Sequence, residues 1–147
     1  MIRLTHTQDQ AIRNHGATEF PLECCGVLLG EVHAGIKVVR EVRPLPNEHE
    51  DERTRRFLIP PTVMRDLMAE EKHTGQVVLG FYHSHPNHPA IPSTYDRQWA
   101  WEWWTYIIVS VQDGVPTNMT AWQLDEDHSE NFLEETIEIR DAGDTET

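Results

Sequence analysis

An apolar run that ends in two histidines spans residues 77–86 and reads Val77-Val78-Leu79-Gly80-Phe81-Tyr82-His83-Ser84-His85-Pro86. Its length and its β-branched and aromatic content predict a buried strand over residues 76–82. In an extended chain, side chains two residues apart point to the same face, with Cα atoms about 6.5–7 Å apart. His83 and His85 therefore point to one side of the strand end, where two imidazoles can bind one metal ion.

A serine and an aspartate follow the histidines at a short distance. Seven residues separate His85 from Ser93, and two separate Ser93 from Asp96. Serine followed three residues later by an acid is typical of a helix N-terminus, so we predict a helix over residues 93–104. Asp96 would add a carboxylate oxygen to the two imidazoles. Three protein ligands leave one position of a tetrahedral zinc ion open for water, which is the pattern of catalytic rather than structural zinc sites.

The remaining segments mix helices and strands without strict alternation. Thr7 and Gln10 have capping-box spacing and predict a helix over residues 7–17. Two prolines at 60–61 open a further helix, which Gly75 ends. Strands are predicted over residues 22–30, 36–42, 57–59, 106–112 and 117–124. This order predicts an α/β fold in which helices pack on the faces of a mixed β-sheet.

The chain length fits a single domain, because 147 residues can enclose one hydrophobic core. We assign residues 1–140 to this domain. The segment 141–147 is expected to be a flexible polar tail, since it is charged and has no hydrophobic periodicity. A monomer or a weak homodimer is expected.

The charge balance and the cysteines restrict the partners and the compartment. Acidic residues outnumber basic residues 25 to 12, and the net charge of −13 opposes binding to a nucleic acid. Cys24 and Cys25 are neighbours and poorly suited to a disulfide bond with each other, so a reducing cytoplasm is expected. The sequence has no signal-peptide pattern and no apolar run of about 20 residues, so no membrane association is expected.

Lysine is scarce in this acidic chain. Lys37 and Lys72 are the only lysines among the 12 basic residues. An acidic, lysine-poor surface suits a cytoplasm of high ionic strength, where salt screens charge repulsion. An ordinary acidic cytoplasmic protein explains the composition equally well, so both interpretations stay open.

The histidine–serine–aspartate spacing resembles a known family motif. The pattern His83-x-His85, seven residues, Ser93, two residues, Asp96 is similar at every position to that of the JAMM (MPN-plus) zinc metalloproteases. The likeness covers about residues 1–125 and is greatest to the short prokaryotic members, because the chain has little room for the insertions of eukaryotic ones. It implies the JAMM/MPN fold, which is related to that of the cytidine deaminases.

The resemblance also implies a role for each site residue. The family has an upstream glutamate that acts as general base, and Glu23, at the start of the apolar segment 22–30, resembles it. By the same resemblance, Ser93 stabilises the oxyanion. The implied ligands of one zinc ion per chain are His83, His85 and Asp96. Taken alone, Ser93 is also explained as a helix cap, and Glu23 as a solvated acid at a strand end.

The function implied by the resemblance is that of a zinc-dependent metallopeptidase. The implied substrate is a ubiquitin-like or sulfur-carrier protein, cut by a zinc-activated water at an amide or isopeptide bond of its C-terminal tail. One alternative is a non-catalytic scaffold or binding module, because the family includes inactive members, although those typically lack a ligand. A zinc deaminase is a weaker alternative, since its His-x-Glu and Pro-Cys-x-x-Cys elements are absent from the sequence.

Other residues near the motif have less specific interpretations. Asn87, His88 and Ile91 lie in the loop between the ligands and could contact substrate. Cys24 is either a reactive thiol beside the metal or a small buried residue.

Four tryptophans follow Asp96 within the predicted third helix. Trp99 and Trp103 are four residues apart, share a helical face and are expected in the core. Trp101 lies on another face and is expected at the surface.

Overall fold

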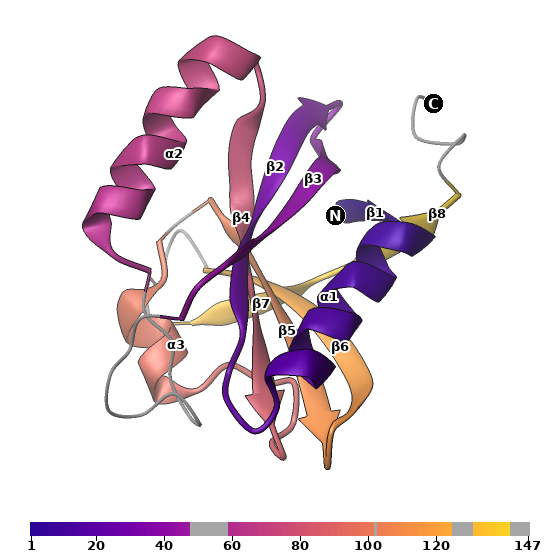
Figure 1. Cartoon of the computed structure of the whole chain (residues 1–147). Coiled ribbons are helices and arrows are strands. Elements are labelled where there is room, and N and C mark those ends of the chain that lie inside the picture. The colour runs from indigo at the N-terminus through magenta and orange to yellow at the C-terminus, as the bar shows by residue number, and fades with distance from the viewer. Residues whose placement is uncertain (48–58, 102, 125–130, 142–147) are drawn as a thin grey trace.

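The computed structural model describes residues 1–47, 59–101, 103–124 and 131–141. In these residues the strands are β1 (Ile2–Thr5), β2 (Cys25–His33), β3 (Ile36–Leu45), β4 (Val77–Pro86), β5 (Thr105–Gln112), β6 (Val115–Leu124), β7 (Phe132–Glu135) and β8 (Ile137–Arg140). They form one sheet in the order β7-β6-β5-β4-β2-β3-β1-β8 (Figure 1). Strand β4 runs parallel to β5 and antiparallel to β2, which confirms the predicted mixed sheet.

The helices in the described residues are α1 (His6–Glu19), α2 (Pro61–Thr74) and α3 (Thr94–Trp99). Helix α2 has the predicted ends: Pro60 is its N-cap, and Gly75 follows it in the left-handed conformation with φ 76°. Helix α1 starts one residue before the predicted range, because Thr5 and Gln8 form the capping box instead of Thr7 and Gln10. Both pairs have the Thr-x-x-Gln spacing, and the earlier one is used because β1 ends at Thr5.

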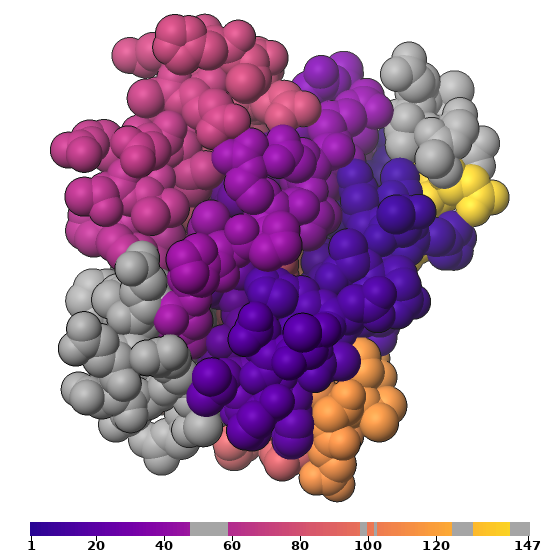
Figure 2. Space-filling model, in the orientation of Figure 1, coloured from indigo at the N-terminus to yellow at the C-terminus, as the bar shows by residue number. Residues whose placement is uncertain are grey.

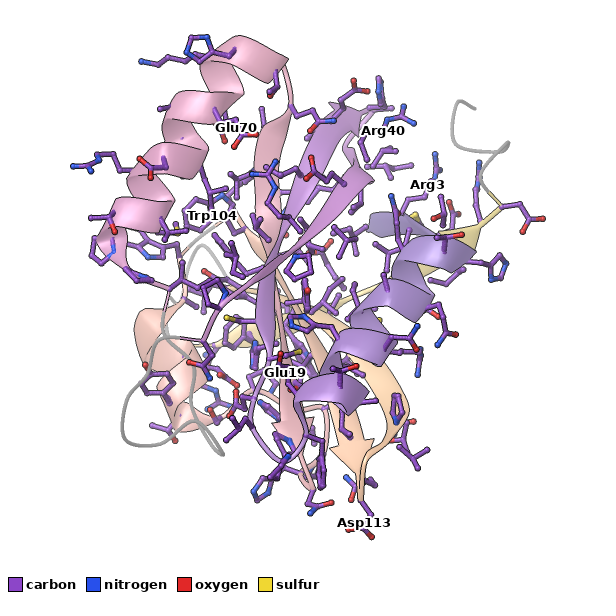
Figure 3. All side chains as sticks on the ribbon, in the orientation of Figure 1. Arg3, Glu19, Arg40, Glu70, Trp104 and Asp113 are labelled. Carbon is purple, nitrogen blue, oxygen red and sulfur yellow. The ribbon has the colours of Figure 1, made fainter. Side chains whose placement is uncertain are left out.

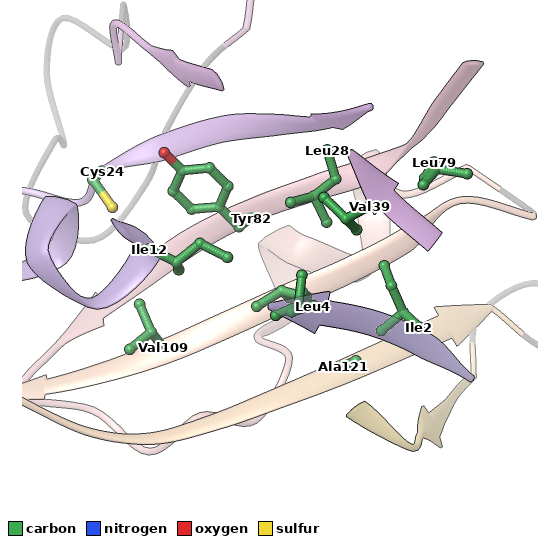
Figure 4. Close-up of a cluster of buried hydrophobic side chains, with 11 residues drawn as sticks. Ile2, Leu4, Ile12, Cys24, Leu28, Val39, Leu79, Tyr82, Val109 and Ala121 are labelled. Atoms are coloured by element: carbon green, nitrogen blue, oxygen red, sulfur yellow. The ribbon is translucent and has the colours of Figure 1, made fainter. Parts of the chain in front are cut away.

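The sheet has a hydrophobic core on each face. Leu28 of β2 packs in a buried cluster with Ile12 of α1, and Figure 4 shows this cluster. The neighbouring residue Val27 packs in a second cluster with Leu67 of α2. Because adjacent side chains of a strand point to opposite faces, α1 and α2 cover opposite faces of the sheet. This two-sided burial explains why the predicted segment 22–30 has no polar face.

Most predicted strands are present with shifted ends. Strand β2 begins at Cys25 rather than at residue 22, and β4 continues through both histidines to Pro86. Strands β5 and β6 form the predicted hairpin through Asp113, which Figure 3 marks at the hairpin tip, and Gly114. Of the strand predicted at 57–59, residues 57 and 58 lie outside the described residues, and Ile59 is not in a strand.

Helix α3 is shorter than the predicted helix 93–104, which is wrong beyond residue 99. The chain leaves the helix at Ala100, and Trp103 has a positive φ of 75°. The buried ammonium group of Lys37 donates a hydrogen bond to the Trp103 carbonyl and lies 4.3 Å from the centroid of the Trp103 ring. These tertiary contacts stabilise a loop where local periodicity alone predicts a helix.

The tryptophans are distributed differently from the prediction. Trp103 is 42% exposed, so its expected core position is wrong, whereas Trp101 is 67% exposed, as expected. The side chain of Trp99 lies outside the described residues. Trp104 instead packs against the cluster beneath α2, and Figure 3 marks it beside that helix.

Strands β7 and β8 connect the two ends of the strand order. Strands β7 and β8 are separated by Thr136 alone, yet β7 pairs with β6 and β8 pairs with β1, at opposite ends of the strand order. Ion pairs join Met1 to Glu135 and Arg3 to Glu138 at this closure. None of the strands β1, β7 and β8 was predicted, because each is only four residues long.

In the view of Figure 2, β3 lies between α2 on the left and α1 on the right.

None of the described helices combines the length and the apolar character that a bilayer crossing requires. Of the predicted tail 141–147, Asp141 is exposed and residues 142–147 lie outside the described residues.

Candidate metal centre

Three potential metal ligands converge at the end of β4. The Nε2 atoms of His83 and His85 lie 3.2 Å apart. His83 Nε2 lies 3.1 Å from Asp96 Oδ1, and His85 Nε2 lies 3.1 Å from Asp96 Oδ2. All three side chains are largely buried, with 1%, 8% and 7% of their surfaces exposed. Two imidazoles and one carboxylate that meet in this way could hold a metal ion.

The two elements that carry the ligands are fixed independently. Strand β4 is hydrogen-bonded to β2 on one side and to β5 on the other, so His83 and His85 stand on a central strand. Asp96 occupies the first turn of α3, where the Ser93 hydroxyl accepts the Asp96 amide at 3.1 Å. The Asp96 carboxylate accepts the Ser93 amide at 2.8 Å, which completes a capping box. The helix cap therefore also aims the carboxylate at the histidines.

A backbone contact determines the tautomer of His85. Its Nδ1 lies 2.8 Å from the carbonyl oxygen of Pro89. Because a carbonyl can only accept, Nδ1 carries the proton and donates it. When the imidazole is neutral, the lone pair therefore lies on His85 Nε2 and points towards His83 and Asp96, as metal ligation requires.

The histidines keep Asp96 ionised. Burial by itself raises the pKa of Asp96, but the charges and hydrogen bonds of protonated His83 and His85 outweigh it and hold this pKa well below its usual range. The carboxylate is thus available as an anionic ligand near neutral pH.

Glu23 is a buried acid close to this cluster. Its side chain lies just before β2, and the residue is 4% exposed. Burial, and secondarily the negative charge of Asp96, raises the pKa of Glu23 to about 9. The alternative of a solvated strand-end acid is therefore wrong. A strongly shifted carboxyl beside a candidate metal cluster is the kind of group that general acid–base catalysis uses.

Two cavities meet at the cluster and differ in character. The first, called the polar cavity, has a volume of about 400 Å³. It is lined by Glu23, His85, His88, Pro89, Ile91, Ser93, Thr94 and Tyr95. The second, called the apolar cavity, has a volume of about 530 Å³. It is lined by Ile59, Pro61, Met64, Met68, Phe81, His83, Tyr95, Asp96, Trp101, Trp104 and Tyr106.

The polar cavity is lined by five of the residues that the sequence singles out. It brings Glu23 and Ser93 together with His85, and His88 and Ile91 also line it, as expected for residues of the ligand loop. The Asn87 side chain instead accepts the Asp113 amide at 2.8 Å and supports the β5–β6 turn.

Cys24 is a buried residue rather than a reactive thiol. It is 1% exposed, and burial raises the pKa of its thiol to about 12. The thiol is therefore protonated and unreactive at neutral pH.

The apolar cavity is the part of the site that the sequence analysis missed. Met64 and Met68 come from α2, whereas Trp101 and Trp104 come from the loop after α3. The methionines are four residues apart on one helical face, which is a visible signal in the sequence. That signal indicates burial only, and the folded loop is needed to bring the tryptophans opposite them.

Together, the α/β fold and the buried His-His-Asp cluster define a single-domain candidate metalloprotein. Residues 7–125 match the model of a family described as prokaryotic homologs of the JAB domain. The chain therefore belongs to this prokaryotic JAB-domain family, which agrees with the resemblance drawn from the motif.

Two relatives have names that state an activity. The chain is 38% identical over 117 residues to a desampylase from Haloferax volcanii, and the match covers 78% of this chain and 79% of the relative. It is 36% identical over 103 residues to a probable TtuB-protein conjugate cleaving protease from Thermus thermophilus. That match covers 70% of this chain and 65% of the relative.

Two solved structures have the same fold. A protein from Desulfitobacterium hafniense matches with a TM-score of 0.80 and 29% identity, covering 96% of this chain and 94% of that chain. A protein from Salinibacter ruber matches with a TM-score of 0.71 and 40% identity, covering 97% and 93% respectively. Both matches extend over almost the whole chain.

Proposed function

We propose that this protein is a zinc-dependent metallopeptidase that hydrolyses an amide or isopeptide bond at the C-terminal tail of a ubiquitin-like or sulfur-carrier protein. The observation that carries the proposal is the convergence of His83, His85 and Asp96 in one cluster, with Glu23 in the wall of the cavity that His85 also lines. The relatives named desampylase and probable TtuB-protein conjugate cleaving protease support a conjugate as the substrate.

The donor set suits zinc. Two imidazole nitrogens and one carboxylate oxygen are typical ligands of catalytic zinc, and oxygen-preferring cations such as Mg²⁺ favour carboxylates and water instead. His83, His85 and Asp96 would hold one zinc ion per chain. Zinc in such a site supplies Lewis acidity, which polarises a carbonyl and makes water a nucleophile near neutral pH.

Glu23 is proposed as the proton carrier. It lines the polar cavity next to His85, so it can accept a proton from the attacking water and pass it to the leaving amine. A cation held by His83, His85 and Asp96 would offset the charge of Asp96, which contributes to the raised pKa of Glu23. The positive charge of the cation would also favour the ionised form of Glu23 against the effect of burial.

Ser93 is proposed to stabilise the oxyanion. Its hydroxyl oxygen accepts the Asp96 amide, which leaves the hydroxyl hydrogen able to donate towards the polar cavity that Ser93 lines. A donor aimed at the developing negative charge lowers the barrier to attack on the carbonyl. The helix cap and the catalytic role are therefore compatible in one side chain.

The experiment that tests the function uses purified protein with and without one equivalent of zinc. The substrates are a ubiquitin-like protein whose C-terminal Gly-Gly is joined to a lysine side chain, and a carrier protein whose C-terminus is joined to cysteine. Zinc-dependent release of the intact ubiquitin-like or carrier protein, abolished by a chelator, is expected. Near-stoichiometric zinc without cleavage across the panel would remove the substrate assignment, and failure to retain zinc would favour a scaffold.

A further inference from the structure

The residue between the two histidines points away from the metal cluster. Ser84 alternates with His83 and His85 along β4, so its side chain projects from the opposite face of the strand. The residue is fully buried, with 0% of its surface exposed. Its hydroxyl oxygen accepts the backbone amide of Cys24 at 2.8 Å, and its own amide donates to the Cys24 carbonyl at 3.2 Å. Ser84 is therefore joined twice to the residue that follows Glu23.

The segment that carries Glu23 lies outside the regular β2–β4 ladder. The first paired residue of β2 is Cys25, which lies opposite His83. Glu23 itself is not in a helix or a strand. Its carbonyl accepts a hydrogen bond from the Asn47 side-chain amide at 3.0 Å. The peptide group between Glu23 and Cys24 is thus held by two side chains: Ser84 of β4 binds its N–H, and Asn47, two residues after β3, binds its carbonyl.

We infer that Ser84 is a positioning residue that fixes the Glu23 carboxylate relative to the two histidines. This inference rests on the proposed function, in which Glu23 carries the proton. Ser84 lies between the two histidines on β4. A movement of this strand end is therefore transmitted through the two hydrogen bonds of Ser84 to Cys24 and the neighbouring Glu23. A general base must stay within hydrogen-bond reach of its proton donor, and a displacement of about 1 Å can cost about 100-fold in rate.

A purely structural role makes different predictions. A buried amide without its acceptor destabilises the folded state, and that effect alone lowers the thermal midpoint without changing turnover by folded protein. Loss of positioning lowers kcat while substrate binding and zinc content stay unchanged. The two roles are therefore separated by kcat, KM and zinc measured on the same preparation.

The test compares Ser84→Ala with Ser84→Thr, which keeps an acceptor oxygen on the same carbon. Asn47→Ala weakens the other attachment of the segment from a partly exposed position, so it tests the inference even if Ser84→Ala folds poorly. The matched control is Thr5→Ala, because the Thr5 hydroxyl likewise accepts a backbone amide, that of Gln8 at 3.1 Å, in the cap of α1.

We expect Ser84→Ala to retain one zinc ion and its KM within about twofold while kcat falls roughly 10- to 100-fold, as for loss of a supporting hydrogen bond near a metal site. Ser84→Thr should restore most of kcat, Asn47→Ala should lower it less, and Thr5→Ala should leave it unchanged. Hydrogen exchange of the Cys24 amide should be faster in Ser84→Ala. In a Glu23→Gln background, Ser84→Ala should cost little further turnover, because the group that it positions is gone.

Three results would overturn the inference: unchanged kcat in Ser84→Ala, a loss of kcat that only follows lost zinc, or equal losses in the alanine and threonine variants. Unchanged exchange of the Cys24 amide would refute the attachment itself. If the wild-type protein cleaves none of the conjugates while Ser84→Ala still accelerates exchange at Cys24, the proposed function fails although the attachment is present.

Discussion

The polar and apolar cavities share the cluster of His83, His85 and Asp96 but offer opposite surroundings. The polar cavity holds the groups that can move protons or donate hydrogen bonds, Glu23 and Ser93. The apolar cavity is walled by methionine, tryptophan and phenylalanine side chains and touches the cluster through His83 and Asp96. Tyr95 lines both cavities and lies at their boundary.

Under the proposed function, we assign the chemistry to the polar cavity and substrate binding to the apolar cavity. Groups that act only on developing charge raise kcat, whereas apolar contacts that are equal in the ground and transition states change KM. Substitutions in the polar cavity should therefore lower kcat, and substitutions in the apolar cavity should raise KM. A polar-cavity variant that raises only KM, or an apolar-cavity variant that lowers kcat, would show that the two cavities do not act separately.

Loss of one metal ligand should remove both zinc binding and turnover. His85→Ala is expected to lose zinc and to have no detectable turnover, because even residues that only support a ligand change activity about 10- to 100-fold. Metal analysis of the purified variant, together with cleavage assays, measures this. His73→Ala, at the exposed end of α2, is the matched control and should retain both. Full zinc occupancy in His85→Ala would contradict ligation by His85.

Glu23→Gln should have the largest effect among variants that retain zinc. The amide cannot accept the proton, so we expect kcat to fall by about 100- to 10,000-fold with zinc content and KM unchanged. Glu31→Gln is the control, since Glu31 lies near the far end of β2 and its side chain is 44% exposed. Turnover equal to wild type in Glu23→Gln would exclude Glu23 as the proton carrier.

Ser93→Ala should lower kcat by about 100-fold, the typical effect of removing one donor to an oxyanion. The lost helix cap should also cost about 1 kcal/mol of folding stability. Steady-state kinetics and thermal unfolding of the same sample distinguish the two effects. Ser93→Thr keeps the hydroxyl and should recover both, so a slow but stable threonine variant would argue against a hydroxyl donor.

The metal-free protein allows a test of Glu23 by pH. Since burial raises its pKa to about 9, folded Glu23 stays protonated where the unfolded carboxyl, with a pKa near 4.5, is already ionised. Stability is therefore lost as pH rises from about 4.5 to 9, by about 1.4 kcal/mol per pH unit from this group. Glu23→Gln lacks this penalty.

Denaturant unfolding of both metal-free proteins at pH 6, 7 and 8 measures the difference. The contributions of other carboxyls are common to the two proteins and cancel. The glutamine variant should gain stability relative to wild type as pH rises. A pH-independent difference would mean that Glu23 is ionised in the metal-free fold.

The smallest expected effect comes from the apolar cavity. Trp101 is 67% exposed at its rim, so Trp101→Ala should barely change stability. We expect KM to rise about fivefold with kcat unchanged, in keeping with about 1 kcal/mol for one aromatic contact. Val115→Ala, an exposed apolar side chain on β6, is the control for general surface effects. A drop in kcat instead would break the division between the cavities.

The regions that the sequence predicted well are those controlled by local rules. The His83–His85 pair follows from strand alternation, and the Ser93–Asp96 pair follows from helix capping, so both halves of the cluster are readable from spacing. Glu23 could be selected only through the family resemblance. Its burial depends on how the segment before β2 lies against β4, and no local pattern encodes that.

The regions predicted poorly depend on distant contacts. The tryptophan loop after α3 is held by Lys37 on β3, which lies more than 60 residues earlier in the chain. The Lys37 ammonium group also donates a hydrogen bond to the Thr105 hydroxyl at 2.9 Å. Strands β1, β7 and β8 are too short to be recognised without their partners. The apolar cavity combines α2 with that loop, so the metal cluster can be predicted from the sequence and the apolar cavity cannot.

The pairing of β1 with β8 has a kinetic consequence. Ile2 lies opposite Ile137, so this pairing joins residues that are 135 positions apart in the sequence. Long loops are costly to close, and contacts across them form late on a folding pathway. We therefore expect β4, which carries both histidines, to pair with its neighbours early and the β1–β8 pairing to form last, and we expect thermal fluctuations to open the β1–β8 pairing first.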